Sequence, residues 1–327
     1  MAELENSGAF VISLDFELHW GVSEHRTVES YHENLINTPL VVNELLNLFT
    51  EQDIRATWAT VGMLFAKNKN ELLTTAEHNF KPTYENTKLS NYKLLTSIGE
   101  NSSDDPFHYA SELILKINNT VGQEVGSHSY SHYYCLEKGQ ELDEFSHDLK
   151  LYKQQAQSYG IESSSFVFPR NQYSRIHLKE LQKLGFKTFR GSEQSWLYAP
   201  RSREKETKVR KLLRLIDAYF KISGDNTHVE GTMEEIVNIP SSRFLRPYDA
   251  RLKFLESLRL SRIKNEMTFA AKNNKIYHLW WHPHNFGKYK NKNFEFLENI
   301  LRHFKHLENI YDFKSRCMSD FVRRVNV

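Results

Sequence analysis

The sequence has a pair of histidines whose spacing suits a metal. The segment Gly126-Ser-His-Ser-Tyr-Ser-His132 puts His128 and His132 four positions apart. Two imidazoles and one carboxylate can bind a divalent metal and leave one coordination position open for water. A metal in such a site lowers the pKa of the bound water and polarises a carbonyl oxygen. A pair at this spacing is also common in ordinary packing, so the hypothesis needs support from other parts of the chain.

Further reactive side chains stand in short groups elsewhere in the sequence. Asp15 and Glu17 are two positions apart, so in extended chain both carboxylates point to the same face. A carboxylate beside a metal site can act as a base toward water, and an imidazole can protonate a departing amine. An arginine can orient the base and lower its pKa. The candidates outside the histidine pair are Asp15, Glu17, Arg170, Asn171, His282 and His284.

The first of these groups follows a short apolar run that is typical of a buried strand. Phe10-Val-Ile-Ser-Leu14 precedes Asp15, and Ile54 to Val61 is the next such run along the chain. Between the two runs, Thr38-Pro39 is a start signal for a helix with one apolar face. Strand, helix and strand in this order indicate a parallel sheet with crossover helices.

Strands and helices continue to alternate along the chain. Strands are predicted to end at Ser127 and to span 165–168, 186–189, 236–239 and 276–281, and helices to span 109–117, 141–159, 174–184 and 252–271. Active sites of parallel α/β folds lie at the carboxyl ends of the strands. The candidate residues follow four different strand ends, so we expect them to meet. The pattern favours one barrel-like or open α/β domain.

Composition and charge restrict the class of protein. Of 327 residues, 39% are hydrophobic and 26% are charged, which is typical of a globular chain and not of a disordered one. The net charge of +2 gives no reason to expect nucleic-acid binding, which needs a basic surface. Cys135 and Cys317 do not make a disulfide framework, and the apolar run near the N-terminus is too short for a signal peptide. A cytoplasmic location is therefore predicted.

A single catalytic domain is predicted over 1–327, with polar insertions at about 67–108 and about 196–232. The second insertion contains the basic stretch 201–220, in which apolar residues such as Val209 and Leu212 share one side. Most such stretches are solvated helix faces, but a basic amphipathic helix can also lie on an anionic membrane surface or hold a phosphate. Peripheral membrane contact through 201–220 is therefore kept as a hypothesis.

Four segments resemble motifs of one enzyme family. Glu124-Val-Gly-Ser-His128-Ser-Tyr-Ser-His132 resembles the metal motif of the polysaccharide deacetylases, carbohydrate esterase family four. The other segments are Ile54 to Gly62, which resembles their second strand, Phe168-Pro-Arg170-Asn-Gln, which resembles their arginine motif, and Tyr277-His-Leu-Trp-Trp-His282-Pro, which resembles the late motif with a catalytic histidine. The resemblance runs from Phe10 to about Gly287. It implies a distorted (β/α) barrel with fewer strands than the usual eight.

The resemblance also implies a divalent metal, with zinc as the expected ion, and roles for the residues around it. His128 and His132 would bind the metal with an acid as third ligand. His282 would protonate the leaving amine, and Arg170 would orient the carboxylate that acts as the base.

The first motif of this chain departs from the family pattern. The family usually has two adjacent aspartates, a base followed by a metal ligand, but here Phe16 follows Asp15. Asp15 is the preferred base and Glu17 the preferred ligand. The opposite assignment stays open, and so does a site without metal, because some relatives hydrolyse cyclic amides without one.

The predicted reaction is the hydrolysis of an N-acetyl or N-formyl group on an amino sugar, in surface-polysaccharide biosynthesis. The predicted substrate contacts are Trp20, Asn171, Trp281 and His284, the tryptophans because an aromatic face suits a sugar ring. A cytoplasmic enzyme would meet its amino sugar linked to a nucleotide or to a lipid phosphate. Two alternatives stay open: a metal-free amidohydrolase acting on a ureide or a cyclic amide, and a glycan-binding relative without activity.

Overall fold

One curled sheet forms the centre of the molecule. The computed structural model describes residues 8–77, 80–229 and 231–322. Within these residues the strand order is β6-β7-β5-β4-β3-β2-β1-β9-β8, with β10 paired to β1, and every pair is parallel except β6 with β7. The strands are β1 (Ala9–Phe16), β2 (Ala56–Thr60), β3 (Gln123–Ser127), β4 (Ser165–Val167), β5 (Thr188–Arg190), β6 (Gly231–Met233), β7 (Ile236–Asn238), β8 (Arg243–Phe244), β9 (Ile276–Trp281) and β10 (Lys314–Arg316).

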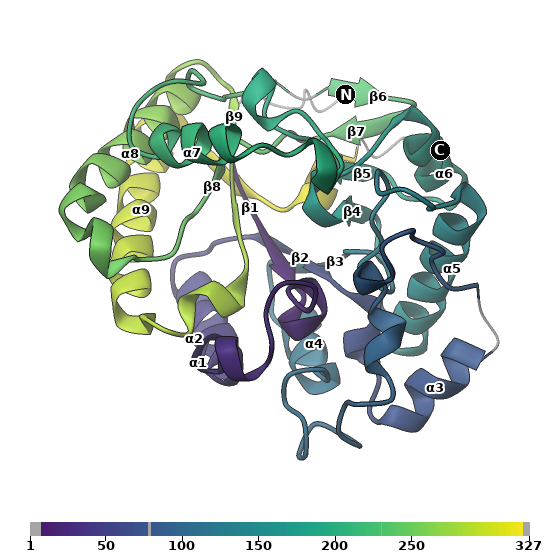
Figure 1. Cartoon of the computed structure of the whole chain (residues 1–327). Helices are drawn as coiled ribbons and strands as arrows, with labels where there is room; N and C mark the ends of the chain where they lie inside the picture. Colours follow the sequence, from purple (N-terminus) through teal and green to yellow (C-terminus); the bar gives the residue numbers. More distant parts are fainter. Residues whose placement is uncertain (1–7, 78–79, 230, 323–327) are drawn as a thin grey trace.

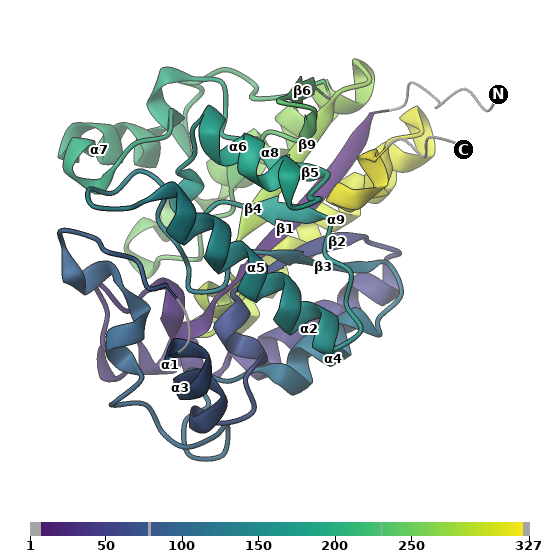
Figure 2. The same cartoon turned by 90° about the vertical axis from the view of Figure 1, so that its right-hand side faces the viewer.

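Helices surround the strands on the outside of the curl (Figure 1). They are α1 (His32–Ile36), α2 (Thr38–Glu51), α3 (Lys69–Glu77), α4 (Ser111–Asn118), α5 (Leu142–Ser158), α6 (Arg175–Lys183), α7 (Lys208–Asp217), α8 (Glu256–Lys272) and α9 (Lys290–Tyr311). In the turned view of Figure 2, α7 lies at the edge of the molecule, away from α2 and α4. The arrangement is a curled half-barrel of parallel strands, so the predicted barrel-like α/β fold is confirmed.

The alternation of side chains along β1 determines which of them point toward the inside of the half-barrel. All eight residues of β1 are buried, because both faces of a parallel sheet are covered. Phe10 and Ile12 pack in the large core with the helices, whereas Ala9 and Val11 belong to a smaller apolar cluster that includes residues of β4 and β9. Asp15 lies on the same face of β1 as Ala9 and Val11, because alternate residues of a strand point the same way. The period that packs Ala9 and Val11 therefore also turns Asp15 toward the inside of the curl.

Most predicted elements are present with ends shifted by a few residues. The strand at 276–281 and the helices at 141–159, 174–184 and 252–271 correspond to β9, α5, α6 and α8. The predictions did not include β6, β8 and β10, which have three, two and three residues and are too short to show a period of two. No helix in the part of the chain that the structure describes combines the length and the hydropathy of a membrane span.

Candidate active site

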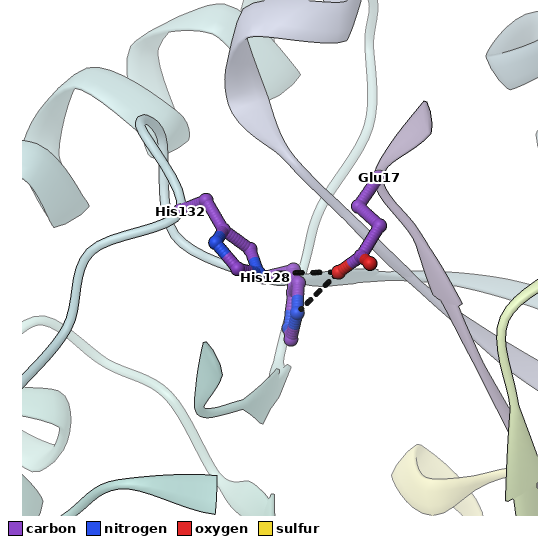
Figure 3. A group of neighbouring side chains, drawn as sticks. All are labelled: Glu17, His128 and His132. Carbon is purple, nitrogen blue, oxygen red and sulfur yellow. Dashed lines mark ion pairs between the residues drawn. The ribbon is translucent and has the colours of Figure 1, made fainter. Parts of the chain in front are cut away.

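Glu17, His128 and His132 converge at the carboxyl end of the sheet (Figure 3). Glu17 Oε2 lies 3.3 Å from His128 Nε2 and 3.1 Å from His132 Nε2. Glu17 directly follows β1, and His128 directly follows β3, two strands away in the sheet. All three side chains are buried. The sheet therefore brings together the two histidines and the preferred acid of the sequence prediction.

The hydrogen bonds of this cluster fit a bound cation. His128 Nδ1 lies 2.8 Å from the carbonyl oxygen of Val167, so Nδ1 carries the proton and the lone pair of Nε2 points at Glu17. Burial lowers the pKa of His132, which keeps its imidazole neutral. Burial opposes ionisation of Glu17, but the charge of the nearby His282 imidazole in its protonated form holds the pKa of Glu17 well below the usual range. A carboxylate that faces imidazole lone pairs is the donor set that a divalent metal accepts.

Gly21 leaves the space that the carboxylate of Glu17 occupies. A Cβ at position 21 would overlap that carboxylate, so any other residue would displace it. Gly21 ends the short turn Leu18–Gly21, which begins directly after Glu17. The close approach of this backbone to Glu17 is a local reason why the acid points into the site.

A buried aspartate holds the loop that carries the second histidine. Asp148 of α5 accepts hydrogen bonds from the backbone N–H of Tyr130 at 2.6 Å and of Ser131 at 2.9 Å, and from the Ser131 hydroxyl. Ser129 and His132 have left-handed backbone conformations, with φ of 60° and 61°, which cost free energy in a residue with a side chain. We infer that the hydrogen bonds to Asp148 stabilise this loop, a role that the sequence analysis did not assign.

Asp148→Asn is expected to change how stability depends on pH. Burial raises the pKa of Asp148 to about 6 from 3.8. The folded state then binds a proton more readily than the unfolded state, so this carboxyl's contribution to the free energy of unfolding falls as the pH rises through that interval. The wild-type free energy of unfolding minus that of the variant should fall by about 3 kcal/mol between pH values of about 4 and 7. Urea unfolding at several pH values measures this difference, and pH profiles that run parallel would contradict it.

Asp15 is bound by an arginine from a different strand than predicted. Arg190, the last residue of β5, donates from Nη1 to Asp15 Oδ1 at 2.7 Å and from Nη2 to Oδ2 at 2.9 Å. Burial would raise the pKa of Asp15, but the guanidinium of Arg190 lowers it below its usual value. Asp15 is therefore ionised at neutral pH. A charged residue at the end of a predicted buried strand is a signal that could have identified Arg190.

The predicted contact of Arg170 with Asp15 was wrong. Arg170 instead forms an ion pair with Glu24, lies 3.5 Å from Glu137 and covers the ring of Tyr134. The chain leaves β4 at Val167 and takes a left-handed conformation at Arg170, with φ of 56°, and the side chain reaches Glu24 and Glu137. Arg170 still lines the wall of the site cavity.

A cavity of about 340 Å³ opens above the cluster and receives most of the candidate residues. His282 Nε2 lies 3.4 Å from Glu17 Oε1 and 3.8 Å from Asp15 Oδ2. The candidate residues that line the cavity are Asp15, Glu17, His128, His132, Arg170, Asn171, His282 and His284, together with Arg190 and Trp280. Burial lowers the pKa of His284 to about 3, so His284 is a neutral wall residue.

Neither predicted tryptophan lines this cavity. Trp20 is fully buried and donates its indole N–H to the carbonyl oxygen of His108 at 2.9 Å. Trp281 is fully buried against Phe286. Side chains alternate along β9, so the face that leads to His282 carries Trp280 instead. The predictions for Trp20 and Trp281 were therefore wrong, and Trp280 is the aromatic residue of the cavity wall.

Comparison with known families supports one assignment. Residues 33–189 match the family model described as polysaccharide deacetylase. These residues include His128, His132 and Arg170 but not Asp15 or His282. The match supports a place in the polysaccharide deacetylase family. This family is generally metal-dependent, and the Glu17 cluster provides a possible site for a metal. No curated protein matches the sequence.

Solved structures show the same fold at low sequence identity. A putative polysaccharide deacetylase from Mycobacterium smegmatis has a TM-score of 0.61 and 13% identity, over 99% of this chain and 92% of that one. Puue allantoinase has a TM-score of 0.54 and 12% identity, over 98% and 91%. A 4-alpha-glucanotransferase from Thermococcus litoralis has a TM-score of 0.50 and 13% identity, over 98% of this chain but 41% of that one. The fold is the (β/α) barrel of the polysaccharide deacetylases.

Proposed function

We propose that this protein is a metal-dependent hydrolase that removes an N-acetyl or N-formyl group from an amino sugar. The observation that carries the proposal is the buried Glu17–His128–His132 cluster, with the carboxylate of Asp15 and the imidazole of His282 beside it. The family match supports a carbohydrate substrate. The proposal adds that the bond broken is an amide C–N bond.

Glu17 is our proposed third ligand and Asp15 our proposed base. Asp15 uses both carboxylate oxygens to bind Arg190, and its Oδ2 is 4.0 Å from His128 Nε2, compared with 3.3 Å for Glu17. An acid engaged in two hydrogen bonds to arginine has less freedom to coordinate a metal. These distances favour Glu17 over the opposite assignment.

Asp15 and His282 are the residues proposed to carry out the two proton transfers of the reaction. A divalent metal held by Glu17, His128 and His132, with zinc as the proposed ion, would supply an electrophile for the carbonyl oxygen and lower the pKa of water. Asp15, kept ionised by Arg190, would take a proton from the attacking water. His282 would give a proton to the sugar nitrogen as the C–N bond breaks. The products are a free amino sugar and a short carboxylic acid.

The proposed setting is the cytoplasm and the biosynthesis of a surface polysaccharide. In that setting the amino sugar would be linked to a nucleotide or a lipid phosphate. Peripheral membrane contact through 201–220 remains part of the proposal. It is supported by Val209, Leu212 and Phe220, which are exposed apolar side chains in and just after α7.

Metal analysis combined with an assay for released carboxylate tests the proposal. We expect about one equivalent of metal per chain and release of acetate or formate from acylated amino sugars. Asp15→Asn should stop release, whereas His306→Ala should not, because His306 is an exposed residue of α9 outside the cavity. Release without metal would favour the metal-free alternative. Neither release nor stoichiometric metal would contradict the proposal and favour a glycan-binding protein.

A further inference from the structure

A second cavity of about 460 Å³ adjoins the first and is rich in cationic side chains. The two cavities share Arg170, Asn171 and Trp280, so they are neighbours along one wall. Five cationic residues line the second cavity: Arg170, Arg201, Lys211, Arg214 and Arg246. It has two acidic lining residues, Glu193 and Glu206. The chain as a whole is nearly balanced in charge, so this excess is local.

Several of these cations lack an acidic partner. Arg214 Nη2 forms an ion pair with Glu206 at 2.7 Å, but Arg201, Lys211 and Arg246 form no ion pair within the described parts of the chain. Burial also raises the pKa of Glu193, which reduces the negative charge available to them. Unpaired cations around one cavity repel each other, and an anion between them removes that repulsion.

The shared wall also offers a hydrogen-bond donor without an acceptor. The indole N–H of Trp280 is buried and has no hydrogen-bond partner among the described residues. A buried donor without a partner costs free energy, which a ligand oxygen can restore. Trp280 lines both cavities, and its indole N–H has almost no exposed surface, so a ligand oxygen reaches this donor only when the indole turns.

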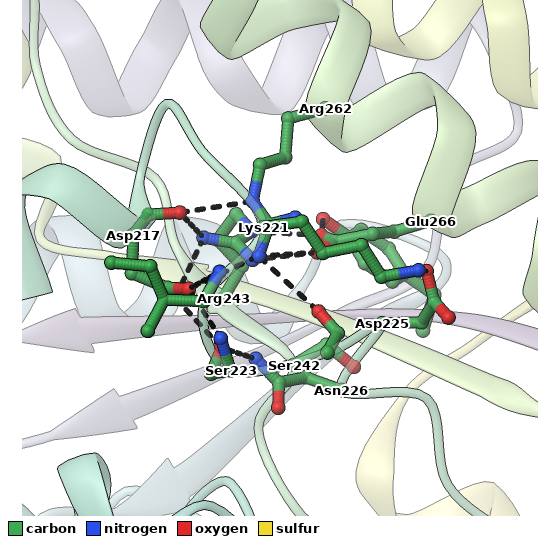
Figure 4. Close-up of polar contacts among 12 residues, drawn as sticks. Asp217, Lys221, Ser223, Asp225, Asn226, Ser242, Arg243, Arg262 and Glu266 are labelled. Carbon is green, nitrogen blue, oxygen red and sulfur yellow. Dashed lines mark hydrogen bonds and ion pairs between the residues drawn. The ribbon is translucent and has the colours of Figure 1, made fainter.

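A buried ionic network fixes the helix that forms one side of this cavity (Figure 4). Asp217, the last residue of α7, accepts a hydrogen bond from Arg262 of α8 at 3.2 Å and lies 3.6 Å from Arg243 of β8. Arg243 in turn donates to Glu266 at 2.7 and 2.6 Å. These bonds hold α7, which carries Lys211 and Arg214, against β8 and α8. The helix that carries two of the cations is therefore positioned before a ligand binds, which lowers the entropic cost of binding.

We infer that the second cavity binds the phosphate or diphosphate group that links the amino sugar to its carrier, while the sugar occupies the first cavity. The placement of the sugar in the first cavity rests on the proposed function. Guanidinium groups bind phosphate oxygens through paired hydrogen bonds, and lysine adds a point charge. A neutral acylated sugar would not need such a group of cations. The same phosphate chemistry occurs in a nucleotide-linked and in a lipid-linked sugar.

Calorimetric titration of the full-length protein with pyrophosphate and with uridine diphosphate tests the inference. Lys211→Gln and Arg246→Gln should each weaken binding about tenfold or more, because each removes a charged partner of the anion. Lys208→Gln is the matched control, because Lys208 is an exposed residue of the same helix that does not line the cavity. Circular dichroism of each variant checks that the chain keeps the overall helix content of the wild type. Absent binding, or equal binding by all three variants, would overturn the inference.

This titration needs no turnover, so its outcome is distinct from the outcome of the deacylation assay. Saturable binding that depends on Lys211 and Arg246 supports a phosphate site in the second cavity even if no acyl group is released. Flotation with vesicles that contain a lipid phosphate, and with neutral vesicles, separates the two sources of phosphate. Binding of uridine diphosphate without flotation indicates a nucleotide carrier. Flotation that is specific to the lipid phosphate and is lost in Arg246→Gln indicates a lipid carrier.

Discussion

His128→Ala is expected to abolish stoichiometric metal binding and to lower kcat/KM for deacylation by about a thousandfold or more. The substitution leaves Glu17 and His132 as the remaining members of a buried three-residue cluster, and two ligands hold a metal poorly. Elemental analysis of the purified protein and kinetics of carboxylate release measure the two effects. His306→Ala removes an exposed histidine of α9, and this variant should match the wild type in both metal content and kcat/KM.

The same measurements on the acids separate the two assignments. Glu17→Gln should lose the metal and the activity together, whereas Asp15→Asn should keep the metal and lose the activity. The reverse result, with metal retained in Glu17→Gln and lost in Asp15→Asn, would make Asp15 the ligand and contradict our proposal. Full activity of His128→Ala without metal would contradict the metal mechanism altogether.

Arg190→Met is expected to cost both stability and activity. It leaves Asp15 buried without its bidentate partner, and breaking a buried ion pair from one side costs about 3–5 kcal/mol of unfolding free energy. Without Arg190, burial raises the pKa of Asp15, so a larger fraction of the base is protonated near neutral pH. The acid limb of the pH profile of kcat/KM should move to higher pH. Chemical unfolding and the pH dependence of kcat/KM measure the two effects.

Arg170→Met is the comparison for this variant. Arg170 lines the same cavity, but its ion pair is with Glu24 and not with Asp15. Its loss should leave the acid limb of the pH profile where it is in the wild type. The acid limb of Arg190→Lys should lie between those of the wild type and Arg190→Met, because a lysine keeps the charge but cannot form both hydrogen bonds. A shifted profile in Arg170→Met together with an unshifted one in Arg190→Met would restore the role predicted from the sequence.

The sign of the effect of Asp15 on stability follows from its lowered pKa. The folded state holds Asp15 ionised more strongly than the unfolded state does. The resulting stabilisation is present above the pKa of the unfolded chain and is lost as the pH falls through the lower folded value. In Arg190→Met this contribution should disappear. The free energy of unfolding of the variant should therefore differ most from that of the wild type at neutral pH and least in acid.

Local sequence patterns were sufficient to find the centre of the site. His128 and His132 were found from their spacing and from the strand before them, and Asp15 and Glu17 from a period of two after another strand. These features depend on short-range backbone geometry, since a strand sends alternate residues to one face and ends where its apolar run ends. The meeting of four strand ends also followed, because parallel strands end at the same edge of a sheet.

The partners of these residues were decided by the tertiary structure. Arg190 ends one buried strand and Arg170 follows another, and the way the strands assemble into the curled sheet determines which of them meets Asp15. The support that Asp148 gives to the histidine loop depends on how α5 packs, which the spacing along the chain does not encode. Side-chain spacing thus determined which faces the reactive groups occupy. The packing of distant elements decided their partners, because those contacts form only when the whole sheet is assembled.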